Sequence, residues 1–173
     1  MENNYPKPII IWHWLTLCLV LIAYFSSGNP LHDKIWGQVH VMSGLLVFAI
    51  SIARVTTVYC YRKQLPHNKI ISRYQEKLFK LFKLVRLVLY LSLFVVPVMG
   101  WLALSSMTSQ FDLYSMQLPL ARLTTSNHLI GEAHQFLGNM FIFFVGLHAA
   151  AALAHHFVFK DGVLKSMLAK NDK

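Results

Sequence analysis

Charged side chains are scarce in this sequence, and acidic ones are the scarcest. The 173 residues include seven Asp and Glu and 16 Lys and Arg, so 13 % of the chain is charged and 55 % is hydrophobic. Soluble domains carry about 25 % charged residues. The composition is therefore not that of an ordinary water-soluble domain, and it indicates a membrane protein.

Cysteine is also rare. Cys18 and Cys60 are the two present, and neither belongs to a CxxC, a CxxCH or a zinc-type spacing. This argues against a cysteine-held metal ion and against covalently attached haem. We expect both thiols to be free, buried and unreactive.

Four hydrophobic runs are long enough for helices that cross about 30 Å of hydrocarbon, which takes about 20 residues. They cover about 8–26, 36–59, 87–106 and 133–159, with a bend expected at Pro97 and Gly100. We predict an all-α membrane protein, a four-transmembrane-helix bundle that is one domain over residues 1–173. The first run is also compatible with a signal peptide. Its flank has one lysine and no clear cleavage site, so we expect it to be retained.

The cations flank these runs mostly on one side, in a set made of Lys7, Arg62, Lys63, Lys69, Arg73, Lys77, Lys80, Lys83, Arg86, Lys160, Lys165, Lys170 and Lys173. The other side has Lys34 and Arg122. By the positive-inside rule, both termini face the cytoplasm. Because topology accounts for the basic charge, we expect no nucleic-acid binding. Residues 74–84 alternate Lys with Leu and Phe at helical spacing, which is typical of a helix on an anionic membrane surface.

Histidines occur inside the hydrophobic runs, where each imidazole needs a partner. His134 and His148 are 14 residues apart, about 21 Å along one face of a helix. His40 begins the second run from the outer side, so it is level with His134. His13 lies about one turn into the first run from the inner side, near the depth of His148. The four histidines thus form two pairs, one in each half of the membrane.

Glycine follows both outer histidines by one turn, as Gly44 in HVMSG and Gly138 in HQFLG. Such positions leave room for a flat, wide group beside the backbone, although small residues are also common at ordinary helix contacts. Arg54, at the depth of the inner pair, needs an anionic partner such as a haem propionate. The alternative is that Arg54 reaches to the inner interface.

Paired neutral imidazoles favour non-covalent haem. Zinc and di-iron sites normally add cysteines or carboxylates, and Glu132 is the only acid near these runs. Two haems stacked across the membrane would carry electrons, whereas a transporter would use the histidines as a proton relay. We expect His155 and His156 to lie at the inner interface in a structural role, with contact to a quinone or a propionate as the alternative.

Several motifs together resemble the bacterial cytochrome b561 family of short di-haem inner-membrane proteins. They are WHW, VHVMSG, LYLSLFVVPVMGW and EAHQFLGNMFIFFVGLHAAAALAHHFVFKDG. The resemblance implies two b haems, with iron ligands paired as His13 with His148 and His40 with His134. It also implies a multi-pass protein of the bacterial inner membrane that exchanges electrons with ubiquinone.

A family member of this kind oxidises superoxide on the periplasmic side, which makes this chain a candidate superoxide:ubiquinone oxidoreductase. The expected partners are membrane lipid, a quinone and a small redox donor such as superoxide. The alternative is a haem-bearing membrane anchor that passes electrons to or from a separate redox protein.

Overall fold

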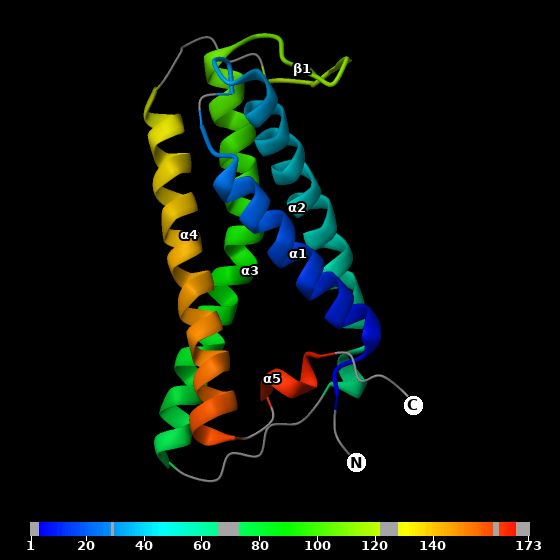
Figure 1. Ribbon diagram of the computed structural model, residues 1–173, viewed down its shortest axis with the longest axis vertical. Coiled ribbons are helices and arrows are strands. Elements are labelled where there is room, and N and C mark those ends of the chain that lie inside the picture. The colour runs from blue at the N-terminus through cyan, green and yellow to red at the C-terminus, as the bar shows by residue number, and fades with distance from the viewer. Residues whose placement is uncertain (1–3, 29, 66–72, 122–127, 161–162, 169–173) are drawn as a thin grey trace.

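The computed structural model describes residues 4–28, 30–65, 73–121, 128–160 and 163–168, without the side chains of 73–79. The elements are α1 (Lys7–Phe25), α2 (Lys34–Cys60), the 3-10 turn η1 (Arg62–Gln64), α3 (Arg73–Met107), β1 (Asp112–Leu113), β2 (Met116–Gln117), α4 (His128–Ala154), the π-helical turn η2 (His155–Phe159) and α5 (Val163–Ser166). Within these ranges, the structure is almost entirely helical (Figure 1).

Four helical segments are long and apolar enough to cross a membrane, by length and composition. They are Lys7–Phe25, Lys34–Cys60, Lys80–Met107 and His128–Phe159. The predicted all-α membrane bundle is therefore confirmed. The helices extend past the hydrophobic runs, however: α3 begins at Arg73 and α4 at His128. Lys, Glu, Gln and Leu are good helix formers, so a helix can continue where the apolar run stops. Residues 74–84 are thus part of α3.

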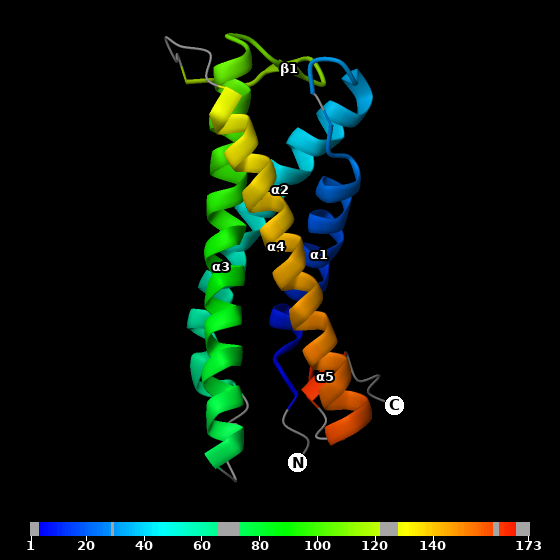
Figure 2. The same ribbon diagram turned by 90° about the vertical axis from the view of Figure 1, so that its left-hand side faces the viewer.

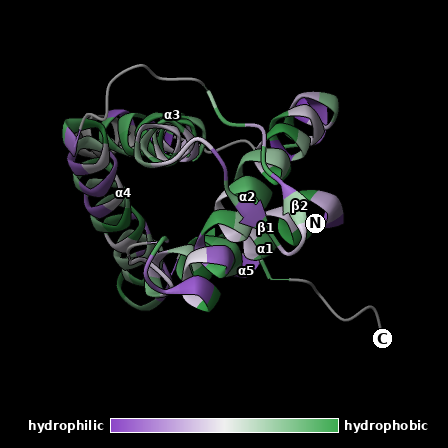
Figure 3. Cartoon of the chain, turned by 90° about the horizontal axis from the view of Figure 1, so that it is seen from above, coloured by the Kyte–Doolittle hydropathy of each residue, from purple (hydrophilic) through white to green (hydrophobic). Residues whose placement is uncertain are grey.

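The helices form two closely packed pairs. The backbone of α1 packs against that of α2, the backbone of α3 packs against that of α4, and α2 also contacts α3. Figures 1 and 2 show that the four long helices run roughly along the long axis of the molecule. Seen from above in Figure 3, α3 and α4 lie on one side and α1 and α2 on the other, with hydrophobic residues on all four.

The end that carries the loops after α1 and α3 is closed by a small hairpin. β1 pairs antiparallel with β2, and Tyr114 and Ser115 form the turn with φ of 50° and 83°. Phe111 and Leu113 pack against Leu104 of α3 in a hydrophobic cluster. This hairpin caps the bundle on the side predicted to be periplasmic.

The opposite end is tied together by the short helix α5. The indole Nε1–H of Trp14 donates to the carbonyl of Met167 at 2.9 Å, and the backbone N–H of Tyr5 donates to the carbonyl of Ser166 at 3.1 Å. The chain after α4 therefore folds back onto the start of α1.

The thiols differ from the prediction in one respect. Cys18 and Cys60 are free, as predicted, but both side chains are exposed rather than buried. Both lie on helices that could cross a membrane, where a helix face that contacts no other helix is left to lipid.

Candidate functional site

The first of two histidine pairs joins α1 to α4. The rings of His13 and His148 have centres 6.3 Å apart, with their planes at 67°. These residues are 135 positions apart in the chain, yet they lie side by side at the level where both were expected from the sequence.

The second pair joins α2 to α4. The ring centres of His40 and His134 are 5.9 Å apart, and the planes meet at 75°. The partner of His13 and the partner of His40 are therefore both on α4. This one helix provides a histidine at each of the two levels.

Both separations match what one metal ion requires. Imidazole nitrogen binds a transition metal at about 2.0–2.1 Å, so two imidazoles on opposite sides of one ion have ring centres about 6 Å apart. In the described part of the chain, no three His, Cys, Asp or Glu side chains converge on a metal-sized space. The available donor sets are therefore pairs, which suits an iron whose other four ligands belong to a porphyrin.

Each pair joins two helices whose backbones are not in close contact. Neither α1 with α4 nor α2 with α4 is among the closely packed helix pairs of the described residues. The histidines bridge these separated helices through their side chains alone. A planar group held between two imidazoles needs this arrangement, because its faces must be open to both rings.

Both outer histidines are held by backbone carbonyls. Nδ1 of His40 lies 2.8 Å from the carbonyl oxygen of Ala23, and Nδ1 of His134 lies 3.1 Å from that of Val96. A carbonyl only accepts, so Nδ1 carries the proton in each ring and donates it. Nε2 then keeps its lone pair for a metal, as in most metal-ligating histidines.

The first of these carbonyls lies at the end of a helix. Ala23 is in the last turn of α1, where backbone carbonyls lack the usual N–H partner further along the helix. Its oxygen accepts from the Ser26 hydroxyl at 3.3 Å as well as from His40, so the end of α1 orients the His40 ring.

The His134 ring packs against Gly100 of α3, which has no side chain to block it. A Cβ built on Gly100 would lie 2.9 Å from Cε1 of the His134 ring, closer than real Cβ contacts. The sequence predicts a bend at Gly100 but not this contact with His134. The helix continues through Pro97 and Gly100. In the sequence, the only sign that another side chain approaches α3 closely at this point is a single glycine within an apolar run.

Arg54 contacts the inner pair. Its Nη2 donates to Nδ1 of His13 at 2.9 Å, and the guanidinium carbon lies 5.3 Å from the centre of the Tyr90 ring. Its Nε is buried, with no hydrogen-bond partner among the described residues. The guanidinium is always charged and only donates, so Nδ1 of His13 accepts in this arrangement.

The inner level therefore differs from the outer one. A neutral imidazole that binds iron through Nε2 carries its proton on Nδ1, where it would face another donor. Iron ligation by His13 thus requires Arg54 to exchange this ring for another acceptor, and a carboxylate is the strongest one for a guanidinium.

An apolar layer separates the two histidine levels. It contains one buried residue from each helix, namely Val20, Val47, Leu93 and Phe141. Phe141 lies seven residues, about 10 Å, from both His134 and His148 on α4. The rings of Phe48 and Phe94 pack beside it with centres 5.8 Å apart. The residues of the layer are buried and apolar, so none of them offers water a hydrogen-bond partner through its side chain.

The two glycines expected beside a flat ligand have open space next to them. A Cβ added at Gly44 or Gly138 would meet no atom within 4 Å. The same holds for Gly131 and Gly146, so this openness does not by itself single out the HxxxG positions.

His155 and His156 lie in η2, away from both pairs. The ring of His155 packs against Phe82 of α3 and Phe159, with centres 5.4 and 5.3 Å away. His156 lies beside Phe157 at 4.8 Å and lines a cavity. The aromatic contacts of His155 are those of a packing residue.

Comparison with known proteins identifies the family of this chain. A family model described as prokaryotic cytochrome b561 matches residues 4–170. The chain belongs to the prokaryotic cytochrome b561 family. The resemblance inferred from the sequence motifs is thus confirmed.

Two relatives of this cytochrome b561 match along nearly their whole length. "Probable superoxide oxidase CybB" of Yersinia pestis is 28 % identical over 177 residues, which cover 98 % of this chain and 98 % of the relative. "Cytochrome b561 homolog 1" of Escherichia coli (strain K12) is 24 % identical over 178 residues, which cover 97 % and 98 %.

Membership fixes the general role of this cytochrome b561. It is a multi-pass bacterial membrane protein, a b-type cytochrome that acts in electron transfer with b-type haem. The paired imidazoles, their spacing and the carbonyls behind the outer rings fit such a group.

Proposed function

We propose that this cytochrome b561 holds two b haems and passes electrons between them across the bacterial inner membrane. His13 and His148 ligate the inner iron, and His40 and His134 ligate the outer one. The proposal treats residues 1–173 as a single transmembrane domain with both termini in the cytoplasm.

One observation carries this proposal. Two histidine pairs have ring centres 6.3 and 5.9 Å apart, and each pair bridges helices whose backbones do not pack closely. A histidine that served only helix packing would have no reason to meet another at a metal-bridging distance, and here this occurs twice.

Arg54, Gly44 and Gly138 complete the two haem sites in this proposal. Arg54 turns from His13 to a haem propionate, which also supplies an acceptor for its unpartnered Nε. Gly44 and Gly138 leave the backbone open beside the outer pair, so that a porphyrin edge can approach it.

Superoxide is the proposed donor, because a relative that matches over 98 % of both chains is named as a probable superoxide oxidase. Ubiquinone is the proposed acceptor, as the sequence resemblance implies. Bound haem supplies one-electron oxidation and reduction of its iron. Two superoxide anions give up one electron each and leave as O₂, and one quinone takes both electrons with two protons from the inner side. The chain itself holds the irons at fixed levels and keeps the layer between them dry.

The first test counts haem. Purified full-length protein should contain two haems per polypeptide and give a reduced-minus-oxidised spectrum of low-spin, bis-histidine b haem. A content of one haem per chain would show that one of the two proposed sites is wrong. A colourless protein from haem-sufficient cells would contradict the whole proposal.

The second test concerns the substrates. The purified protein should reduce a soluble ubiquinone when superoxide is generated, and boiled protein should not. The other outcome is a protein that keeps both haems and yet reduces the quinone only when a redox protein co-purifies with it. That result would identify it as the membrane anchor of that partner.

A further inference from the structure

The end of α4 builds a feature that the haem sites do not use. After Ala154 the helix widens into the π-helical turn η2, and Lys160 then takes a left-handed conformation with φ of 52°. A non-glycine residue at positive φ is uncommon, and π-helical turns recur at functional sites. Together they end the helix and turn the chain back toward α1.

The returning chain is fixed in place. Helix α5 is tied to the start of α1 through the hydrogen bonds of Trp14 and Tyr5 to the carbonyls of Met167 and Ser166. Lys165 is therefore held opposite η2.

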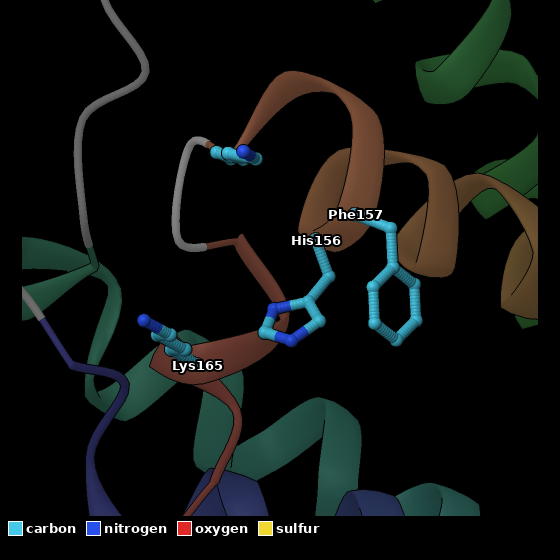
Figure 4. A pocket seen from close by; sticks show the side chains of 4 residues that line it. His156, Phe157 and Lys165 are labelled. Carbon is cyan, nitrogen blue, oxygen red and sulfur yellow. The ribbon is translucent and has the colours of Figure 1, made fainter.

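A cavity of about 260 Å³ lies between η2 and α5. Of the described residues, four line it: His156, Phe157, Lys160 and Lys165. Figure 4 shows the His156 ring directed toward Lys165 on α5, with Phe157 beside it. Two lysines and one histidine are thus among the four described residues that line this space, and none of these four is acidic.

The surroundings of the cavity are apolar on one side. Phe157, Val158 and Phe159 expose 68, 70 and 57 % of their surface. On a helix that could cross a membrane, such residues lie in lipid and the lysines lie at the headgroups. The cavity is therefore at the boundary between the acyl chains and the polar surface.

We propose that this cavity binds the phosphate of an anionic phospholipid. Lys160 and Lys165 pair with the phosphate from opposite sides, and the His156 ring donates a hydrogen bond to it. Phe157 lies along the first part of an acyl chain. At about 260 Å³ the cavity is smaller than the ~300–1,000 Å³ of sites that enclose drug-sized ligands, so it suits a headgroup better than a whole ring-bearing ligand.

This site is independent of the haem proposal, since no haem ligand lines it. It lies at the end of the bundle that carries most of the Lys and Arg, the side predicted to be cytoplasmic. The inner leaflet there is rich in anionic lipid, so its usual headgroups match the chemistry of the cavity.

The experiment measures lipid binding to the full-length haem-loaded protein in detergent by native mass spectrometry. Phosphatidylglycerol and phosphatidylcholine are titrated separately. The test variant is Lys160→Gln with Lys165→Gln, and the control is Lys34→Gln with Lys63→Gln, which removes the same charge from exposed positions elsewhere. Haem content and helicity must be equal in all three proteins.

We expect the wild type and the control to bind phosphatidylglycerol with equal affinity, and more tightly than phosphatidylcholine. Loss of both cavity lysines should weaken binding of phosphatidylglycerol by about tenfold, because each basic residue near a headgroup contributes several-fold. Equal binding by the test and control variants would overturn the proposal, as would equal affinity for the two lipids.

Inorganic phosphate distinguishes the two sources of the same anion. We expect it to displace phosphatidylglycerol only at high concentration, since it lacks an acyl chain to contact Phe157. If phosphate instead binds as tightly as the lipid, and through the same lysines, then the ligand is free phosphate and the lipid assignment is wrong.

Discussion

At the scale of single residues, the two histidine levels are built differently. The outer rings each donate Nδ1–H to a carbonyl, which leaves Nε2 ready for iron. The inner ring of His13 instead accepts from Arg54. The outer site is thus prepared by the backbone alone, and the inner site depends on where one guanidinium points.

Replacing one inner ligand should separate the two haems. If His148 ligates the inner iron as proposed, His148→Ala should lose about half of the haem and keep the outer haem. Haem quantified per chain, together with the reduced-minus-oxidised spectrum, measures this. His128→Ala is the control, because its side chain is 81 % exposed, and it should keep both haems. Full haem content in His148→Ala would show that the pairing is wrong.

Gly100→Ala should affect helix stability and haem binding in opposite directions. Alanine in place of glycine inside a helix favours the helix by up to about 1 kcal/mol. The new Cβ would meet the His134 ring at 2.9 Å and displace it, so the outer haem should bind more weakly. Thermal unfolding of the apo-protein and haem titration measure the two effects. Gly131→Ala, with open space at its Cβ, should leave haem affinity unchanged.

At the scale of elements, α4 and α5 have the clearest separate roles. α4 supplies one histidine to each level and places Phe141 between them. α5 is only four residues long, too short to be stable alone, and it depends on its contacts with α1. The inner end of the bundle is therefore held by a few hydrogen bonds.

Trp14→Phe should loosen α5 without disturbing the rest. The change removes the hydrogen bond from Nε1 to the Met167 carbonyl, worth about 1 kcal/mol net. Hydrogen exchange at the amides of Met167 and Leu168 should accelerate by about fivefold. The matched control is Trp101→Phe, whose indole donates to the Pro119 carbonyl at the other end. Equal exchange at α5 in the two variants would mean that Trp14 does not hold this helix.

At the scale of the whole molecule, the bundle is two helix pairs joined across an apolar layer. The two pairs contact each other through α2 and α3, and histidine side chains join α4 to α1 and to α2 at two levels. Lys and Arg are concentrated at one end, so the positive-inside rule predicts that the histidine level at the other end meets the periplasm.

Thiol labelling in cells tests that direction. With Cys18 replaced by Ser, Cys60 is the one thiol left, at the end predicted to be cytoplasmic. A membrane-impermeant maleimide should label it only after the inner membrane is opened. A cysteine placed at Ser115 of the hairpin, in a chain without Cys18 and Cys60, should be labelled in intact spheroplasts. The reverse pattern would invert the topology.

Much of this protein could be predicted from local properties of the chain. Hydrophobic runs give the four spans, the distribution of cations gives their direction, and the rise of 1.5 Å per residue gives the depth of each histidine. These quantities depend on one segment at a time, so no knowledge of neighbouring helices is needed. The depths along the helices group His13 with His148 and His40 with His134, and the structure brings the same residues together. Their role as iron ligands stays a prediction.

The lateral arrangement was decided only by the tertiary structure. Lipid tails are as apolar as leucine, so hydrophobicity does not specify which helix faces touch, and close packing and hydrogen bonds do so instead. That is why the carbonyls of Ala23 and Val96, the contact of Gly100 with His134 and the bond from Arg54 to His13 were not foreseen. The same holds for the hairpin and the fold-back of α5, which rest on contacts between segments distant in the chain. Sequence alone determined the levels at which the histidines lie, and packing between helices determined what each ring touches.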